Sequence, residues 1–125
     1  MLLLIAVFHI VMFASVKPVI DYVLSLFIGE IPEAETAGTK LDSYNSNSHC
    51  DRFDPSYMVE AKIDPVFIIH DFNRGYIWTR YEYWVYDKNA NLLWGFANRF
   101  PTPPARWTIE KVNEEWVIVD VYEAP

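Results

Sequence analysis

The most chemically suggestive pair in this chain is His70-Asp71, which lies one residue before the turn-like tripeptide Asn73-Arg74-Gly75. A histidine beside a carboxylate can act as a general base whose pKa is tuned for proton transfer. Adjacent residues of a β-strand point to opposite faces of the sheet, however, so Asp71 would not orient the His70 ring. We therefore treat His70 and Asp71 as weak candidates for catalysis and expect His70 to pack on neighbouring aromatic side chains.

A second cluster, His49-Cys50-Asp51 with Asp54, has side chains that can bind metals. Protein metal sites usually show spaced pairs such as C-x-x-C or H-x-x-x-H, and this segment contains neither. We expect a solvated loop here, with no metal site and no cofactor. Because Cys50 is the only cysteine, no disulfide can form within the chain, and the fold has to depend on packing.

A candidate ligand-binding group lies in YIWTRYEYWVY (76–86). Alternate residues of a strand share a face, so Arg80 and Glu82 lie between Trp78 and Trp84 on one face, and Tyr81 lies on the other. Around the inside of a curved sheet, these five residues are candidates to bind a small polar ligand. The competing interpretation is an ion pair on a solvated sheet, with the tryptophans packed around the arginine stem.

These residues belong to a run of predicted strands that begins near residue 59. Segments rich in β-branched and aromatic residues alternate with turn residues, and the first is interrupted at Asp64-Pro65 because proline cannot donate to a strand ladder. We predict a curved antiparallel sheet of four to five strands, from 58–72, 76–86, 92–100, 106–112 and 116–124. With a helix packed across it, this is an α+β domain.

The last two strands are expected to supply much of the core. Alternation places Trp107 and Ile109 in the same buried layer as Trp116 and Ile118. If a helix covers this layer, Trp116 should be nearly fully buried. The same alternation turns the valines of the last strand away from the layer: Val117, Val119 and Val121.

Residues 1–17 form an apolar segment with Lys17 as its only charged side chain. Continued to Ile28, the segment is long enough to cross a bilayer, which takes about 20 residues. Three interpretations stay open: a membrane anchor, a cleaved signal peptide, or a buried helix of a soluble protein. The anchor is favoured over the signal peptide because no Lys or Arg precedes the run and residues 14–16 make a poor cleavage site.

The following residues, 18–29, carry an apolar stripe at helical spacing. Pro18 suits the first turn of a helix and Gly29 suits its end, so we predict a short amphipathic helix packed on the sheet. Residues 30–58 are polar and turn-prone and are expected to be irregular. The predicted organisation is therefore an anchor or signal segment over 1–17 and one α+β domain over 18–125.

Charge and composition restrict the partners. The net charge of −7 disfavours nucleic acid, which requires a basic surface, and it disfavours anionic lipid headgroups. Membrane contact through residues 1–28 therefore has to be hydrophobic. Aromatic residues make up 17% of the chain, which is high for so small a domain, so we expect an aromatic sheet face to be covered by a protein partner or by a second copy.

Two terminal segments resemble the nuclear-transport-factor-2-like (NTF2-like) family. VIDYVLSLFIGEIPEA (19–34) resembles the first helix of that cone fold, and ARWTIEKVNEEWVIVDVYEAP (105–125) resembles its closing hairpin, while YIWTRYEYWVYDKNANLL (76–93) fits its long central hairpin. The resemblance implies a reduced form of the cone, because 30–58 is too short for the family's two further helices. It also implies two kinds of function: exported or single-span assembly modules, and small isomerases or dehydratases built on pocket carboxylates, Tyr and His.

The favoured prediction is a non-enzymatic protein-interaction or assembly module that is membrane-anchored with an extracytoplasmic domain, or secreted. The alternative is a cone-fold small-ligand binder or a small isomerase- or dehydratase-type enzyme that uses His70, Asp71, Arg80 or Tyr81 around an apolar cavity. The identity of the partner or ligand, and the fate of the N-terminal segment, stay open at this point.

Overall fold

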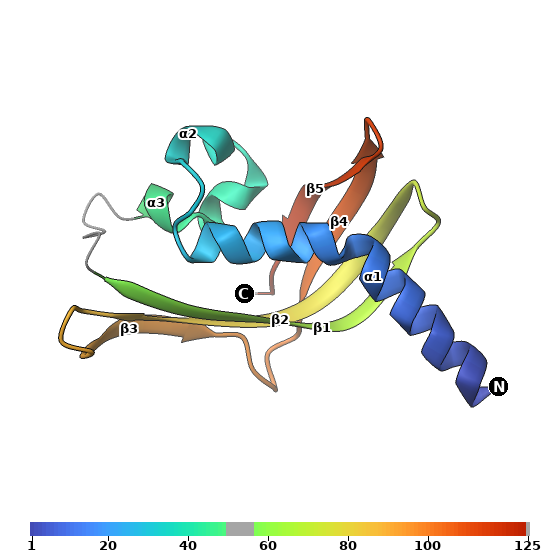
Figure 1. Ribbon diagram of the computed structural model, residues 1–125, viewed down its shortest axis with the longest axis horizontal. Coiled ribbons are helices and arrows are strands. Elements are labelled where there is room, and N and C mark those ends of the chain that lie inside the picture. Colours follow the sequence, from blue (N-terminus) through green and yellow to red (C-terminus); the bar gives the residue numbers. More distant parts are fainter. Residues whose placement is uncertain (50–56, 125) are drawn as a thin grey trace.

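The computed structural model describes residues 1–49 and 57–124, and Figure 1 shows a long helix lying across one face of a bent sheet. The expected α+β class is confirmed. The helices are α1 (Leu2–Phe27), α2 (Glu33–Thr36), the 3₁₀ turn η1 (Lys40–Tyr44) and α3 (Ser46–His49). The strands are β1 (Met58–His70), β2 (Arg74–Tyr86), β3 (Leu92–Ala97), β4 (Ala105–Val112) and β5 (Glu115–Tyr122).

Strand β2 organises the sheet, because it pairs with three other strands. One of its edges pairs with β1 along the whole length of the strand. The other edge is divided, with residues 74–79 paired to β4 and residues 82–86 paired to β3. Strand β5 pairs with β4 and completes an open antiparallel sheet of five strands, as expected; β1, β3 and β5 each pair with a single strand and lie at its edges.

The interruption expected at Asp64-Pro65 is a β-bulge within one continuous strand. The pairing of β1 with β2 shifts between Pro65 and Phe67, so Val66 is the extra residue. A proline is accommodated because β1 is an edge strand that needs no N–H donor on its free side. The bulge therefore bends the strand without ending it.

Helix α1 joins two segments that were expected to be separate. It runs continuously through Pro18, which lies inside the helix instead of starting a new one. Proline removes the hydrogen bond to the Ala14 carbonyl and crowds that group, and Figure 1 shows that the helix bends part-way along its length. The end near Gly29 is as expected: Gly29 has a φ of 82° and its N–H donates to the Leu26 carbonyl.

One stripe of α1 packs against the sheet and forms the core. Its buried residues are Met12, Val16, Val19, Ile20, Val23, Leu26 and Phe27. They meet one face of the sheet, which we call the covered face; on β2 it carries Ile77, Thr79, Tyr81, Tyr83 and Val85. The opposite face, which we call the open face, carries Tyr76, Trp78, Arg80, Glu82 and Trp84. The stripe begins at Met12, so the packed part of the helix is longer than the predicted 18–29.

Residues 33–49, predicted to be irregular, form three short helices that two asparagines hold to one another and to the segment that follows α1. The buried Asn45 amide donates to Thr36 Oγ1 at 2.9 Å and to the Pro32 carbonyl at 3.2 Å. The Asn47 amide donates to the Gly29 carbonyl at 3.0 Å and to that of Ile31 at 2.7 Å. The Asn/Ser-rich composition thus supplies hydrogen bonds to backbone groups that would otherwise be unpaired.

The closing hairpin differs from its prediction in one register step. Trp107 and Ile109 are fully buried, whereas Trp116 and Ile118 are only partly buried against them. The pairing of β4 with β5 shifts between Thr108 and Ile109, so Trp107 lies opposite Val121 and that valine packs on the core instead of facing away. Trp107, not Trp116, is the deeply buried tryptophan.

The difference in burial between Trp107 and Trp116 can be tested by substitution. Trp107→Ala removes a side chain with 0% exposure and leaves Tyr44 without the indole N–H that reaches it at 3.1 Å. We expect a loss of about 3–5 kcal/mol in the free energy of unfolding, measured by urea denaturation. Trp116→Ala is the matched control and should lower the free energy of unfolding clearly less, because Trp116 is only partly buried. Equal losses for the two variants would contradict this assignment of the core.

Candidate functional site

The five residues predicted to bind a ligand do not converge on one site. Trp78, Arg80, Glu82 and Trp84 lie on the open face, while Tyr81 is buried on the covered face beneath α1. This is the alternation expected of a strand. The sheet, however, curves around α1, so the four open-face side chains do not line the inside of a cone.

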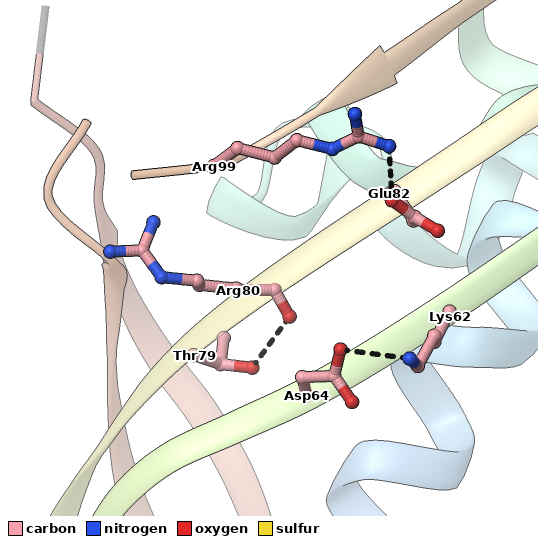
Figure 2. Close-up of polar contacts among 6 residues, drawn as sticks. All are labelled: Lys62, Asp64, Thr79, Arg80, Glu82 and Arg99. Atoms are coloured by element: carbon pink, nitrogen blue, oxygen red, sulfur yellow. Dashed lines mark hydrogen bonds and ion pairs between the residues drawn. The ribbon is translucent and has the colours of Figure 1, made fainter. Parts of the chain in front are cut away.

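The charged groups of the open face are paired with neighbours on the same strand, on other strands or on loops, and Figure 2 shows how they lie. Arg99 Nη2 lies 3.1 Å from Glu82 Oε2, and Lys62 Nζ lies 3.3 Å from Asp64 Oδ2. Arg80 donates to Asn98 Oδ1 and to the Thr102 carbonyl, both at 2.9 Å. Arg80 and Glu82 therefore bond to different partners, and exposed ion pairs of this kind contribute about 0–1 kcal/mol each.

Aromatic rings lie between these charges. The Trp84 ring lies on Gly95 so closely that a Cβ there would stand 2.1 Å from Trp84 Cε3. The guanidinium of Arg106 lies 5.7 Å from the Tyr76 ring centroid and 5.3 Å from that of Tyr122. Such cation–π contacts favour the position of the Arg106 guanidinium beside these two rings. The open face is thus an aromatic surface that also carries arginine side chains.

His70, the weak catalytic candidate, is buried and fully hydrogen-bonded. Its Nδ1 lies 3.0 Å from the Phe72 backbone N–H, which can only donate, so the ring proton is on Nε2. Nε2 lies 2.6 Å from Ser15 Oγ, and the Ser15 hydroxyl donates to the Met12 carbonyl at 2.9 Å. Burial is the main cause that lowers the pKa of His70 below its ordinary value. With its Nδ1 lone pair occupied and its other nitrogen protonated, the ring holds α1 to β1.

Asp71 serves the turn that follows His70. Its Oδ1 accepts the backbone N–H groups of Asn73 and Arg74 at 2.9 and 2.8 Å. The Arg74 N–H and then the Asn73 N–H lower the pKa of Asp71. The Ser15–His70–Asp71 series therefore lacks the geometry of a nucleophilic triad, in which the carboxylate accepts the Nδ1 proton of the histidine. The expected packing of His70 on aromatic rings is present, with the Trp116 ring at 4.9 Å and that of Phe72 at 4.7 Å.

A second polar cluster lies under α1 and was not foreseen from the sequence. The Trp107 indole donates to the Tyr44 hydroxyl, and the Tyr81 hydroxyl donates to Glu123. Phe27 stacks on Tyr81 at 5.2 Å. Burial is the largest cause that raises the pKa of both tyrosines, so their hydroxyls stay protonated and act as structural donors.

A cavity of about 680 Å³ lies between α1 and the closing hairpin. The helix contributes Ser15, Pro18, Val19 and Tyr22, and Leu41 closes one side. The hairpin contributes the remaining lining residues: Lys111, Glu114, Glu115, Trp116, Val117 and Ile118. The Lys111 ammonium lies 5.3 Å from the Trp116 ring centroid. The volume suits a small organic molecule.

None of the residues predicted for a site lines this cavity. Ser15 was the one signal available in the sequence, because it is the only hydroxyl in the first sixteen residues. The described residues contain no group of three His, Cys, Asp or Glu side chains placed to hold a metal ion. The metal-capable side chains at Cys50, Asp51 and Asp54 lie outside the described residues, as does the side chain of His49.

The buried His70 predicts a specific dependence of stability on pH. Because its pKa in the folded protein is below the ordinary 6.5, the folded state binds a proton less readily than the unfolded state. Stability due to His70 is therefore full above about pH 6.5 and falls as the pH drops further. His70→Gln should show a smaller loss of unfolding free energy between about pH 7.5 and 5.5 than the native chain, measured by urea denaturation.

The window between about pH 7.5 and 5.5 also separates the contribution of His70 to stability from that of Asp71. The Asp71 carboxyl has an ordinary pKa of 3.8 and a lower one in the folded protein, so its contribution disappears only at more acidic pH. Asp71 and Lys111 are the charged groups that influence the pKa of His70, after burial; Asp71 raises it and Lys111 lowers it. Parallel pH profiles for the native chain and the variant would contradict the assignment.

Comparison with protein-family models, curated proteins and solved structures found no match to this chain. The resemblance to the NTF2-like family therefore depends on the patterns in 19–34, 76–93 and 105–125, and it stays a prediction. The structure itself gives an α+β fold whose N-terminal helix is, by length and composition, apolar enough to be a membrane anchor or a signal sequence.

Proposed function

We propose that this chain is a non-enzymatic interaction module that α1 attaches to a membrane. One observation carries the proposal: the two halves of the same helix have different environments. From Met12 onward α1 supplies the core, whereas Leu2–Val11, which we call the projecting segment, is exposed and almost entirely apolar. A soluble protein rarely exposes so much contiguous apolar surface. A lipid bilayer covers this apolar area, so that it is not exposed to water, and the sheet domain then lies at the membrane surface.

The open face is the proposed contact surface for a second copy or for a protein of a larger envelope assembly. Aromatic residues and arginine are the types enriched at the centres of protein interfaces. Tyr122 is exposed on this face, and the Arg106 Nε is buried without a hydrogen-bond partner in the part of the chain that the structure describes. The reduced NTF2-like fold and an extracytoplasmic location are part of the same proposal.

The groups that would serve catalysis support a non-enzymatic role. His70 has both nitrogens engaged, Asp71 caps a turn, and the Tyr81 hydroxyl is bonded to Glu123 beneath the helix. Each of these residues stabilises the fold at the position where it lies. The carboxylate, tyrosine and histidine that the alternative enzyme would require have structural partners instead.

Deletion of residues 2–11 tests the attachment. The full chain should float with phosphatidylcholine vesicles in a density gradient, and the shortened chain should remain in solution. The shortened chain should keep its near-ultraviolet circular dichroism, because the first buried helical residue is Met12. Flotation of the shortened chain to the same extent would contradict attachment through the projecting segment.

A charge on the open face tests the contact surface. Tyr76→Lys places a second cation beside Arg106, and chemical cross-linking of the membrane-bound chain to itself or to its partner should fall about tenfold. Ala34→Lys on α2 is the matched control, since it adds the same charge at an exposed site on the helix side of the sheet. Equal cross-linking of the two variants would place the contact elsewhere.

The cavity beside Trp116 favours a second candidate function, the binding of a small, mainly apolar ligand. Apolar side chains line most of it, and its charged lining residues are Lys111, Glu114 and Glu115. Ligand sites of this kind combine an apolar lining with a few charged groups.

The indole signals of the tryptophans can test this candidate by nuclear magnetic resonance. Titration with 1-anilinonaphthalene-8-sulfonate should shift the Trp116 indole N–H signal and leave that of Trp94, on β3, unchanged. Leu41→Trp fills part of the cavity and should weaken binding about tenfold, whereas Leu93→Trp on β3 should not. Uniform shifts of all indole signals would indicate adhesion to exposed surface and would remove the candidate.

A further inference from the structure

The projecting segment is apolar around its whole circumference. All ten residues of Leu2–Val11 are exposed, and His9 is the only polar side chain among them. A helix that docks on a protein surface shows one apolar stripe and one polar side. Only a surrounding apolar medium covers a helix on every side, so the segment's pattern favours lipid over a second copy of the chain.

The remainder of α1 packs against the sheet. Met12, Val16, Val19 and Ile20 are buried against the sheet, and a membrane span over residues 2–21 would have to withdraw all four. The exposed helical residues measure about 15 Å at 1.5 Å per residue. The hydrocarbon core of a bilayer is about 30 Å thick, so this length corresponds to one leaflet.

The β-bulge extends the apolar surface from the helix onto the sheet. Val66 and Phe67 are exposed and line a groove of about 130 Å³ with His9 and Phe13 of α1. The His9 and Phe67 ring centroids lie 5.8 Å apart. The domain therefore presents its own apolar residues directly beside the base of the projecting segment.

The charges near this surface argue for neutral lipid. Lys17 pairs with Asp21 at 2.8 Å, and Lys62 on β1 pairs with Asp64 at 3.3 Å. The chain as a whole carries −7. Paired charges on an acidic domain give no attraction to anionic headgroups, so binding has to come from apolar contact with zwitterionic lipid.

From these observations we propose that the protein is monotopic. Leu2–Val11 enters one leaflet of a phospholipid bilayer, Phe13, Val66 and Phe67 enter beside it, and the folded domain lies directly on the headgroups. This inference rests on the proposed membrane attachment and states its mode: α1 does not cross the bilayer while its second half holds the sheet.

Depth measurements test the mode. The full chain with Cys50→Ser and either Leu3→Cys or Val11→Cys is labelled with a fluorophore and bound to phosphatidylcholine vesicles. Quenching lipids carry a nitroxide either near the headgroup or near the end of the acyl chain. In a monotopic protein the Leu3 probe is the deeper one, and the Val11 probe is quenched mainly by the shallow nitroxide. In a spanning protein the Val11 probe is the deepest, and Leu3→Cys reacts with an impermeant reagent only from inside the vesicle; that pattern overturns the inference.

The bulge is tested by a matched pair of substitutions. Val66 and Leu92 are almost equally exposed, at 55% and 57%, and Figure 1 shows β3 and the N-terminus at opposite ends of the molecule. Val66→Glu should weaken vesicle partitioning about tenfold, and Leu92→Glu should change it less than about twofold. Thermal denaturation of both variants checks that the fold is retained. Equal effects of the two substitutions would overturn the role of the bulge.

The outcomes separate this inference from the proposed function. Vesicle binding with a spanning pattern leaves membrane attachment in place and removes the monotopic mode. Absence of vesicle binding, or self-association in buffer that Val66→Glu abolishes, removes both. Binding that requires phosphatidylserine in the vesicles overturns the proposed contact with neutral lipid. Tight binding to pure phosphatidylcholine with the Leu3 probe deepest supports it.

Discussion

The contact between α1 and the covered face of the sheet is the interaction on which the rest of the structure depends. Trp107 lies at its centre, fully buried, and its indole N–H reaches Tyr44 in the 3₁₀ turn. Asn45 then holds the short helices together, Asn47 bonds them to Gly29 just after α1, and the Ser15–His70 hydrogen bond fastens the middle of the helix to β1. Without a disulfide or a described metal site, packing of this single helix is what closes the core.

Much of the fold could be predicted because it follows from local patterns. Alternation along 76–86 assigned each side chain of β2 to its face, and Gly29 marked the end of α1. Two of the errors, at Pro18 and at Val121, have one physical origin: both positions are set by interactions between distant segments. Pro18 bends α1 without ending it because the sheet supports both sides of the kink, and the shift at Thr108 and Ile109 that turns Val121 inward depends on pairing with β4.

The candidate site was less predictable for the same reason. His70 could be recognised as a residue that packs on aromatic rings, but its hydrogen-bond partner Ser15 lies 55 residues earlier in the chain. The cavity beside Trp116 is bounded by α1, the 3₁₀ turn and the closing hairpin, which no spacing in the sequence relates to one another. The open-face residues were placed correctly with respect to their strand, but the direction in which the sheet curves decides whether they face a cavity or solvent.

The bulge in β1 has a further consequence for chains that are crowded together. Molecules confined to a surface meet in two dimensions, where the free edges of their sheets can join and grow into fibrils. Pro65 deprives the exposed edge of one amide donor, and the extra residue Val66 breaks the regular spacing of its neighbours. A second chain approaching this edge finds no continuous ladder to extend, so the strand is protected against aggregation.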